Sequence, residues 1–406
     1  MKSETVSIDI AASTDVGLVR TNNEDYYLAV DLVNGQVLDS DYQVERPVDE
    51  LYLLLAVSDG MGGQVAGEVA SKLAVSTLCQ RLMKLTRRLT PYDRLVQAVE
   101  HANAQVYQES RRNTKCNGMG ATLTAALVEG DQIYIAEVGD SRAYLLRNGR
   151  IKQVTTDQSL IEILVSRGLL SAQDAERSTN RGVLLQAIGT KEEIQVAVTS
   201  LPLLNKDCLL LCSDGLSNKV SDIELLEVIA NHSNLQDACE ELIQIACQSG
   251  GEDNITALIA QFNGEGLASH SSGKITTTLQ ALSTFDPDRP RSKKRTQRLS
   301  SVPANKTLVF PSTVGINTPS RDLINYPRYE ELLAEFERLA YHLEKAQESL
   351  GVEMKELKGL AEWLQQGGAL DARLPDVFAK LRSAQTSLEQ VRTTVTDAKE
   401  RFKKKN

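Results

Sequence analysis

The sequence predicts an α+β fold, a four-layer αββα sandwich in which two antiparallel sheets pack face to face with helices on the outside. One observation behind this prediction is a series of short apolar segments joined by tight turns, among them Asn148-Gly149, a pair that favours two-residue hairpins. Another is that amphipathic helical patterns come in pairs, at residues 66–88 and 92–111 and again at 222–231 and 235–248. Hairpins and helix pairs do not fit the regular alternation of a parallel βαβ fold.

The expected elements follow one another in a simple order. Strands are expected at residues 5–10, 26–30 and 51–57, and the first helix pair follows them. A four-stranded meander comes next, at residues 121–128, 132–138, 142–146 and 150–154. The last strands are expected at residues 194–199, 208–213 and 254–262, with the second helix pair before the final strand.

Charge and composition divide the 406 residues into three parts. Residues 1–263 carry a net charge of −14, residues 264–325 of +5, and residues 326–406 of 0. The middle part holds five of the ten prolines, many Ser and Thr residues and the basic run 289–295, so we expect a disordered linker. The basic run is typical of a solvated spacer; an anionic docking patch and a phosphorylatable segment are the alternatives.

Two long amphipathic helices are expected in residues 326–406. The apolar positions between Leu332 and Leu350 are spaced alternately by four and three residues, and the stripe resumes after Gly367-Gly368, from Val377 to Phe402. Because a lone helix cannot bury such a stripe, we expect a helical hairpin or coiled coil that serves targeting or oligomerisation. Packing of the helices onto the first domain is the alternative.

Several protein classes do not fit the composition. Aromatic residues make up 4% of the chain and there is a single Trp, which argues against a nucleic-acid stacking surface. The longest strongly apolar run, 51–57, is too short to span a bilayer, and the first residues lack the apolar core of a signal peptide, so we expect a cytoplasmic protein. Six cysteines without a C-x-x-C or a nearby His pair predict reduced thiols, with Cys208 and Cys212 on one face of a buried strand.

Four acidic clusters lie beside expected strands and carry the chemical information. They are Asn23-Glu24-Asp25, Ser58-Asp59-Gly60-Met61-Gly62-Gly63, Ser213-Asp214-Gly215 and Gly251-Glu252-Asp253-Asn254. A carboxylate at the end of a buried strand is costly unless a cation compensates its charge. Since all four histidines lie outside these clusters, the oxygen ligands predict Mg²⁺ or Mn²⁺ rather than Zn²⁺. A single Asp-Gly pair would be only a turn.

The motifs together resemble the bacterial branch of the metal-dependent protein serine/threonine phosphatases, the protein phosphatase 2C family. The resemblance covers about residues 5–262. It is carried, in order, by the run from Thr14 to Asp25, Asp59-Gly60-Met61-Gly62-Gly63 with Ala66-Gly67-Glu68, Met119-Gly120-Ala121-Thr122, Val138-Gly139-Asp140-Ser141-Arg142, Ser213-Asp214-Gly215-Leu216, and Asp253-Asn254-Ile255-Thr256.

The resemblance implies a two-metal centre at one end of the sandwich and assigns roles by position. Asp59 would bridge both metals and Gly60 would offer its carbonyl, while Asp214 and Asp253 would hold the other side. Glu24 and Asp25 would bind or orient metal-bound water, and Arg20 would bind the phosphate. Asp140 would join Asp214 at a third, weaker metal site. A hydroxide bridging the metals would attack phosphorus directly, without a phosphoenzyme.

Residues 155–190 match the mobile flap of this family, and here the sequence departs from the family pattern. Gln158 replaces the usual His of Asp-His-Ser, and Ser178-Thr179 replaces a frequent His-Pro. Gln64 stands where many bacterial relatives have His, and Met61 stands where eukaryotic relatives have a His proposed as general acid. The general acid therefore stays open between a side chain and a metal-bound water.

The function expected from these residues is a phosphoserine/phosphothreonine protein phosphatase that depends on two or three Mg²⁺ or Mn²⁺ ions. Its partners would be phosphorylated proteins, with an opposing serine/threonine kinase implied. Two alternatives stay open. One is a catalytically degenerate phosphoprotein-binding scaffold, and the other is a phosphatase acting on a small phosphomonoester.

Overall fold

The computed structural model describes residues 5–38, 42–62, 66–168, 170–171, 174–175, 182–269 and 279–287. The chain divides into two units, Met1–Gln297 and Arg298–Asn406, and all described residues belong to the first. The predicted helical hairpin at 326–406 and most of the predicted linker at 264–325 lie outside the described residues.

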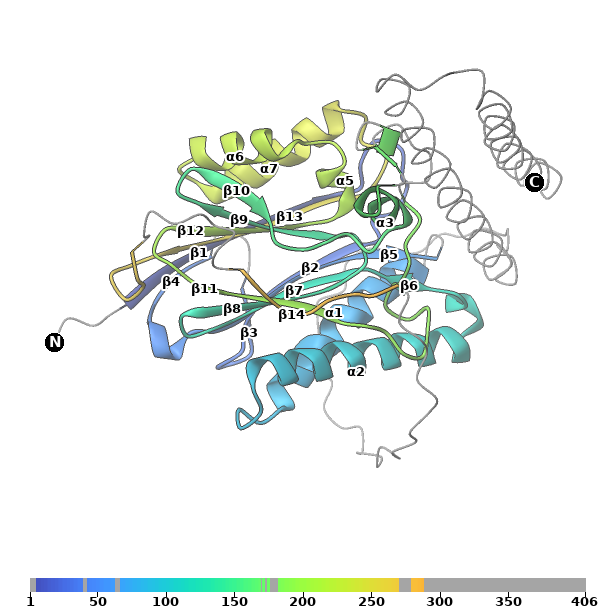
Figure 1. Cartoon of the computed structure of the whole chain (residues 1–406), viewed down its shortest axis with the longest axis horizontal. Coiled ribbons are helices and arrows are strands. Elements are labelled where there is room, and N and C mark those ends of the chain that lie inside the picture. The colour runs from blue at the N-terminus through green and yellow to red at the C-terminus, as the bar shows by residue number, and fades with distance from the viewer. Residues whose placement is uncertain are drawn as a thin grey trace, which may run out of the picture. The chain divides into compact units, whose positions relative to one another are not determined.

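Two antiparallel sheets form the centre of the fold, as the sequence predicts (Figure 1). The six-stranded sheet has the order β10 (Arg150–Gln153), β9 (Arg142–Arg147), β12 (Asp207–Cys212), β13 (Ile255–Asn263), β1 (Thr5–Asp15), β4 (Tyr42–Pro47). The eight-stranded sheet has the order β14 (Gln280–Ser283), β11 (Ala197–Pro202), β8 (Gln132–Val138), β7 (Leu123–Glu129), β5 (Tyr52–Met61), β2 (Asp25–Asp31), β3 (Gln36–Val37), and β6 (Gly120–Ala121) pairs with β5.

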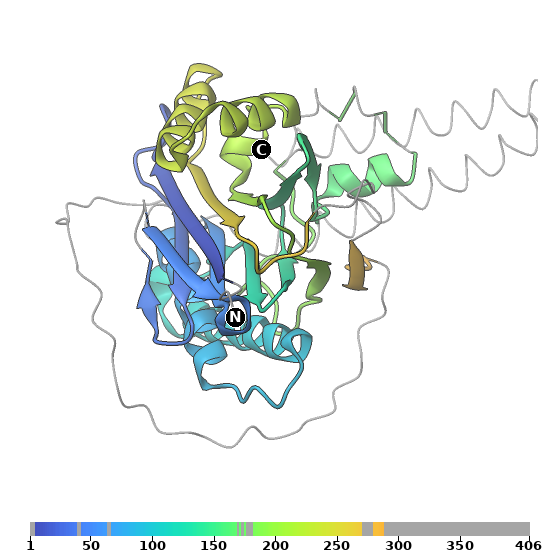
Figure 2. The same ribbon diagram turned by 90° about the vertical axis from the view of Figure 1, so that its left-hand side faces the viewer.

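Helices cover the outer face of each sheet, which completes four layers (Figure 2). The pair α1 (Ala66–Lys84) and α2 (Pro91–Arg112) covers the eight-stranded sheet, and α6 (Asp222–Asn231) and α7 (Leu235–Gln248) cover the six-stranded sheet. Shorter helical elements lie in the connections. They are η1 (Val48–Glu50), η2 (Thr114–Cys116), α3 (Leu160–Ser166) and α5 (Asp214–Ser217).

Local sequence explains where these helices begin. Thr90 accepts a hydrogen bond from the Asp93 backbone N–H (3.1 Å) at the start of α2, and Pro91 occupies the first turn, where its missing N–H costs nothing. Ser221 and Glu224 form a capping box at the start of α6. Such caps are worth about 1 kcal/mol each, so the helix starts are encoded locally.

Strand β5 shows how the core is divided. Its side chains alternate, so that Leu54 and Ala56 pack under α1 and α2, whereas Leu53 and Leu55 face the other sheet. Each fully buried Leu contributes about 2 kcal/mol of transfer free energy. A third apolar cluster lies between the six-stranded sheet and α6 and α7, and it contains both Cys208 and Cys212. All six cysteines are free thiols, as predicted.

The structure differs from the prediction at three short strands. β3, β4 and β14 were not expected, and β14 lies in the segment predicted as linker, where it pairs with β11. Leu267, also in that segment, is 4% exposed and packs in the core between the sheets. The first unit therefore extends past residue 263. Within the described parts of the chain, no helix has the length and apolar character needed to cross a membrane.

Candidate metal centre

The predicted acidic clusters meet at one end of the sandwich, near α5 and β6 in Figure 1. Asp59 lies near the end of β5 and Asp25 begins β2, while Asp140 follows β8 in the same sheet. Asp214 follows β12 and Asp253 precedes β13 in the other sheet. Because neighbouring strands run antiparallel, the end of one strand and the start of its neighbour share an edge. Both sheets thus supply carboxylates to one site.

Asp25 and Asp59 stand directly opposite each other across the β2–β5 pair. Like charges at such a position are destabilising in the absence of a compensating cation. Asp25 is 7% exposed, and its Oδ2 accepts hydrogen bonds from Ser213 Oγ (2.6 Å) and Thr256 Oγ1 (2.7 Å) of the other sheet. Its burial raises the pKa of Asp25 to about 7, and the Ser213 and Thr256 hydroxyls partly oppose that shift.

Burial and mutual repulsion act on the other carboxylates as well. Burial, followed by repulsion from Asp25, Asp214 and Asp140, holds the pKa of Asp59 well above its ordinary value. The pKa of Asp140 is raised by burial and then by Asp214, and that of Asp214 is raised to about 6 by burial and then by Asp253. A site that disfavours its own negative charges in this way favours cations.

Two buried oxygen atoms support this inference. Asp25 Oδ1 and Asp214 Oδ1 have no hydrogen-bond partner among the residues that the structure describes. Buried carboxylate oxygens normally accept hydrogen bonds, so an oxygen without one calls for an explanation. A bound ligand such as a cation would supply the missing partner. Asn218 Nδ2 donates a hydrogen bond to Asp214 Oδ2 (3.1 Å), which leaves Asp214 Oδ1 as the oxygen that could bind a ligand.

In the described part of the chain, side chains alone do not enclose a metal. Among the described residues, no group of three or more His, Cys, Asp and Glu side chains is arranged so that it could hold a metal ion. Mg²⁺ keeps several water ligands and needs only one or two carboxylates, and a backbone carbonyl suits it as well. The donor set therefore fits a hydrated Mg²⁺ or Mn²⁺ ion, with Gly60 as the predicted carbonyl ligand.

Close backbone packing surrounds Gly60. A Cβ atom at this position would lie 2.1 Å from the Gly67 carbonyl oxygen, and one on Gly67 would lie 2.5 Å from the Glu24 carboxyl carbon. The Gly60 N–H donates to the Glu24 carbonyl (3.1 Å), and Ser71 Oγ donates to the same oxygen (2.6 Å). Only glycine permits this approach, so the Asp59-Gly60 end of β5 and Glu24 are held together.

Arg20 lies at the rim of the site. Its guanidinium is half exposed and donates to Asp253 Oδ2 at 2.9 Å. Asp253 Oδ1 accepts from the Asn254 backbone N–H at 2.9 Å. The predicted phosphate-binding residue thus lies beside a predicted metal ligand, with its side chain open to solvent.

Two residues that tie the site together received no role in the sequence analysis. Asn254 is 4% exposed; its amide donates to the carbonyls of Val16 (2.9 Å) and Asn22 (3.0 Å), and its oxygen accepts from the Glu24 N–H (2.7 Å). Thr122 Oγ1 accepts from the Asp59 N–H (2.8 Å). Both belong to motifs that carry the resemblance, which was the only available signal.

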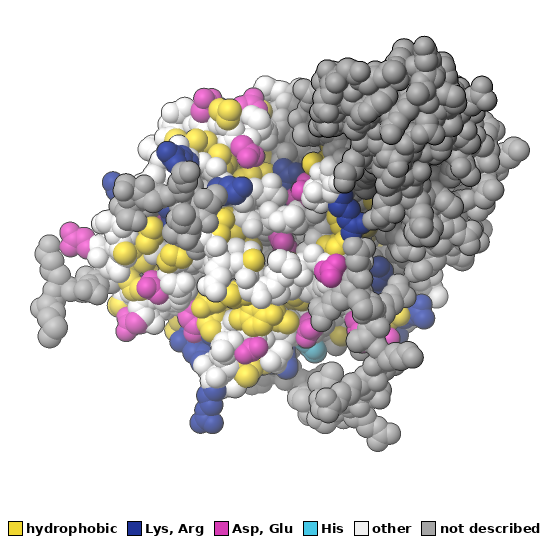
Figure 3. Space-filling model, in the orientation of Figure 1, with side chains coloured by type: hydrophobic (Ala, Val, Ile, Leu, Met, Phe, Trp, Pro, Cys, Tyr) yellow, Lys and Arg dark blue, Asp and Glu magenta, His cyan; other side chains and the backbone are white. Residues whose placement is uncertain are grey.

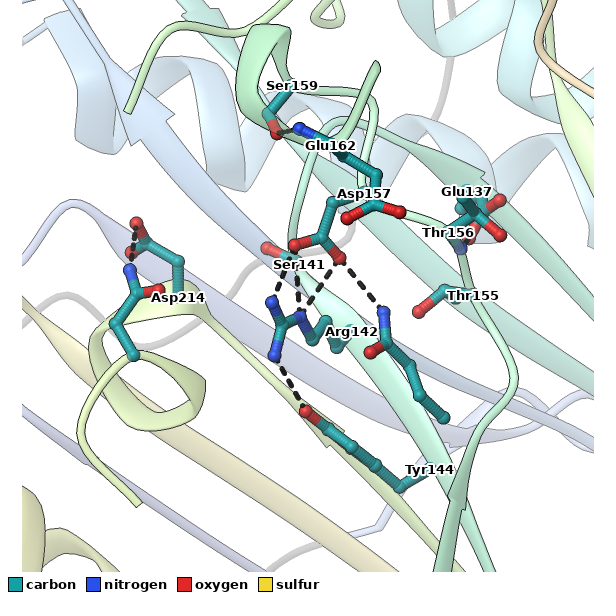
Figure 4. Close-up of polar contacts among 12 residues, drawn as sticks. Glu137, Ser141, Arg142, Tyr144, Thr155, Thr156, Asp157, Ser159, Glu162 and Asp214 are labelled. Carbon is teal, nitrogen blue, oxygen red and sulfur yellow. Dashed lines mark hydrogen bonds and ion pairs between the residues drawn. The ribbon is translucent and has the colours of Figure 1, made fainter. Parts of the chain in front are cut away.

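Arg142 pairs with Asp157 and with Tyr144 (Figure 4). Its Nε and one terminal nitrogen donate to the two Asp157 oxygens at 2.9 and 2.7 Å, and the other terminal nitrogen donates to Tyr144 Oη at 3.0 Å. This two-point pairing joins β9 to the first residues of the predicted flap. The flap base is closed by a bridge between Ser159 and Leu184, and Ser159 caps α3.

Comparison with known proteins places this geometry in context. The family model described as protein phosphatase 2C matches residues 31–259, more than half of the chain. The serine/threonine phosphatase stp of Listeria welshimeri is 36% identical over 253 residues, which are 62% of this chain and 94% of that protein.

Solved structures are similar as well. The crystal structure of the Mycobacterium tuberculosis serine/threonine phosphatase PstP/Ppp aligns with a TM-score of 0.54 and 33% identity, over 65% of this chain and all of that one. A PstP catalytic domain in complex with two manganese ions aligns with a TM-score of 0.53 and 32% identity, over 64% of this chain and 99% of that one.

Proposed function

Because the chain belongs to the protein phosphatase 2C family and is a serine/threonine protein phosphatase, we propose that it hydrolyses phosphoserine and phosphothreonine in proteins in a metal-dependent reaction. The observation that carries the metal dependence is the pair Asp25 and Asp59, two carboxylates opposite each other in a buried site. A protein kinase that acts on the same substrates is implied.

The chain's own residues would divide the work. Asp59 and the Gly60 carbonyl would hold cations on the eight-stranded sheet, and Asp214 and Asp253 would hold them on the other sheet. Asp140 would contribute to a weaker third site. When bound, the Mg²⁺ or Mn²⁺ ions would activate water for attack on phosphorus and neutralise charge on the phosphate oxygens.

Arg20 binds the phosphate and orients it. Its planar fork matches two phosphate oxygens, which the single point charge of a Lys does not. The half-exposed position of Arg20 at the rim gives a phosphorylated side chain access without deep burial of the polypeptide that carries it. Glu24 and Asp25 would orient water within the site. The water oxygen bonds to phosphorus as the bond to the Ser or Thr oxygen breaks, and the proton that the water gives up is taken by that leaving oxygen.

The direct test is hydrolysis of an aryl phosphate and of phosphopeptides in the presence of Mn²⁺, with the parent protein and an Asp59→Asn variant. If Asp59 holds the cations, its replacement would remove several kcal/mol of charge stabilisation, so we expect at least about a 100-fold lower rate. Asp131→Asn, in the exposed β7–β8 turn, is the matched control.

Each alternative function corresponds to a different result. Equal rates for the parent and Asp59→Asn would contradict the proposal. A protein that neither binds Mn²⁺ nor hydrolyses any phosphopeptide would be a binding scaffold. Preference for small phosphate metabolites over phosphopeptides would identify a phosphomonoesterase of another specificity.

A further inference from the structure

Gln158, the flap residue that departs from the family pattern, holds the turn that carries Asp140. Its side chain is 1% exposed. Gln158 Oε1 accepts from the Gly139 N–H (3.0 Å), and the Gln158 N–H donates back to the Gly139 carbonyl (2.8 Å). Its Nε2 donates to the Glu137 carbonyl (3.2 Å). These bonds hold both sides of the residue that precedes Asp140.

The turn requires glycine at the position before Asp140. Gly139 has φ of 108°, a conformation that favours glycine, and a Cβ atom there would lie 2.8 Å from the Thr122 side chain. Because both the N–H and the carbonyl of Gly139 bond to Gln158, this glutamine helps to position Asp140.

A second buried amide continues the chain of hydrogen bonds away from the site. Gln186 Nε2 donates to Gln158 Oε1 (2.8 Å) and to the Gln195 carbonyl (2.6 Å), and Gln186 Oε1 accepts from the Gln195 N–H (3.1 Å). Gln186 is 6% exposed. It bridges the start of the flap to the segment that leads into β11.

The third glutamine contacts the segment 279–287, the last that the structure describes. Gln195 Nε2 donates to the Asp286 carbonyl (2.8 Å), and Gln195 Oε1 accepts from the Asp286 N–H (3.1 Å). The same segment is held by strand β14, which pairs with β11, and by Ser283 Oγ, which donates to the Val196 carbonyl (2.9 Å). β14 lies on the face shown in Figure 3, and its first two residues are exposed.

A backbone group determines the orientation of each of the three glutamine side-chain amides. A backbone N–H can only donate, and the Oε1 atoms of Gln158, Gln186 and Gln195 each accept from one. None of the three side chains can be flipped without placing two donors against each other. Displacement at one end is therefore not absorbed by a simple amide rotation along the way.

We propose that Gln158, Gln186 and Gln195 form a relay through which docking of residues 279–286 on β11 holds the Gly139–Asp140 turn in place. Gln158 and Gln186 are positioning residues for Asp140, and the docked segment is an internal binding partner of the catalytic domain. The consequence for metal binding rests on the proposed function. The mechanical coupling between β14 and the Gly139–Asp140 turn does not rest on the proposed function.

The test uses the full chain and measures amide hydrogen exchange in peptides that cover 138–141, 279–287 and, as a remote reference, α6. Gln195→Ala removes both side-chain bonds to Asp286 but keeps the backbone bonds to Gln186. We expect faster exchange in 279–287 and about tenfold faster exchange at Gly139, the change that loss of one buried hydrogen bond produces, with α6 unchanged. Gln186→Ala should also accelerate amide hydrogen exchange at Gly139.

A kinetic readout separates positioning from general destabilisation. For Gln195→Ala we expect the Mn²⁺ concentration that gives half-maximal phosphatase rate to rise several-fold, with the rate at saturating Mn²⁺ unchanged. The matched control is Gln280→Ala, an exposed β14 residue outside the relay, for which neither quantity should change.

Faster exchange in 279–287 with unchanged exchange at 138–141 would overturn the relay. Equal behaviour of Gln195→Ala and Gln280→Ala would do the same. If the protein showed no hydrolysis at all, the proposed function would fail, while coupled exchange at the two segments would still support the relay.

Discussion

Glu137, at the end of β8, is a buried carboxylate whose removal should stabilise the protein. It is 9% exposed, and its Oε2 accepts from the Thr156 N–H at 2.9 Å. Burial raises its pKa from an ordinary 4.5 to about 8; the Thr156 bond partly opposes this shift, and repulsion from Asp157 adds to it. The folded protein therefore holds this carboxyl in its neutral form where the unfolded chain ionises it.

The sign and size of the effect follow from linkage between protonation and folding. Because the pKa in the fold is the higher one, this group's contribution to the free energy of unfolding is largest below pH 4.5 and falls as the pH rises to 8. The raised pKa of Glu137 lowers the free energy of unfolding by about 3 kcal/mol at pH 7 and by less than about 1 kcal/mol at pH 5. In Glu137→Gln the amide oxygen still accepts from Thr156 but carries no charge.

We therefore expect Glu137→Gln to raise the free energy of unfolding by up to about 3 kcal/mol at pH 7 and by less than about 1 kcal/mol at pH 5. The assay is urea denaturation at both pH values in EDTA, so that metal loading does not vary. Glu227→Gln, at an exposed position on α6, is the control. An increment that is absent, or equal at the two pH values, would refute the reasoning.

Three further substitutions test other parts of the structure. Asp207→Asn leaves the buried Arg147 without the carboxylate it contacts at 2.6 and 2.7 Å, so denaturation should show a loss of about 3–5 kcal/mol; a loss below about 1 kcal/mol would contradict this. Gly67→Ala pushes against the Glu24 carboxyl group and should lower kcat/KM on the order of 100-fold, whereas an unchanged value would show that Glu24 has room to move. Arg20→Lys should raise KM for a phosphopeptide about tenfold while the unfolding free energy stays within about 0.5 kcal/mol, because the side chain is half exposed; an unchanged KM would remove Arg20 from phosphate binding.

Much of the fold could be predicted from local sequence. The helices at 222–231 and 235–248 have the predicted bounds, and β8 does as well, because caps and periodicity are encoded within each segment. The missed strands β3, β4 and β14 are short edge strands, and their existence depends on a partner elsewhere in the chain. β14 pairs with β11 across some 80 residues of sequence, a contact that no local pattern indicates.

The predicted site depended on both levels. Its carboxylates could be named because an Asp at the end of an apolar strand is costly without a cation. The positions of these carboxylates relative to one another could not be predicted. Only the register of β2 against β5 places Asp25 opposite Asp59, and only sheet packing brings Ser213 and Thr256 to Asp25. The buried ion pair of Arg147 and Asp207 joins β9 to β12, and no local pattern in the sequence indicates it.

The sequence by itself determined the order of strands and helices, the α+β class, the acidic clusters and, through the motifs, the family. These properties are local or are read from residue type. The tertiary structure decided which carboxylates face each other, which oxygen atoms are left without partners, and that three glutamines join the C-terminal strand to the turn beside Asp140. Hydrogen bonds between residues far apart in sequence depend on distance and orientation in space, which no single segment specifies.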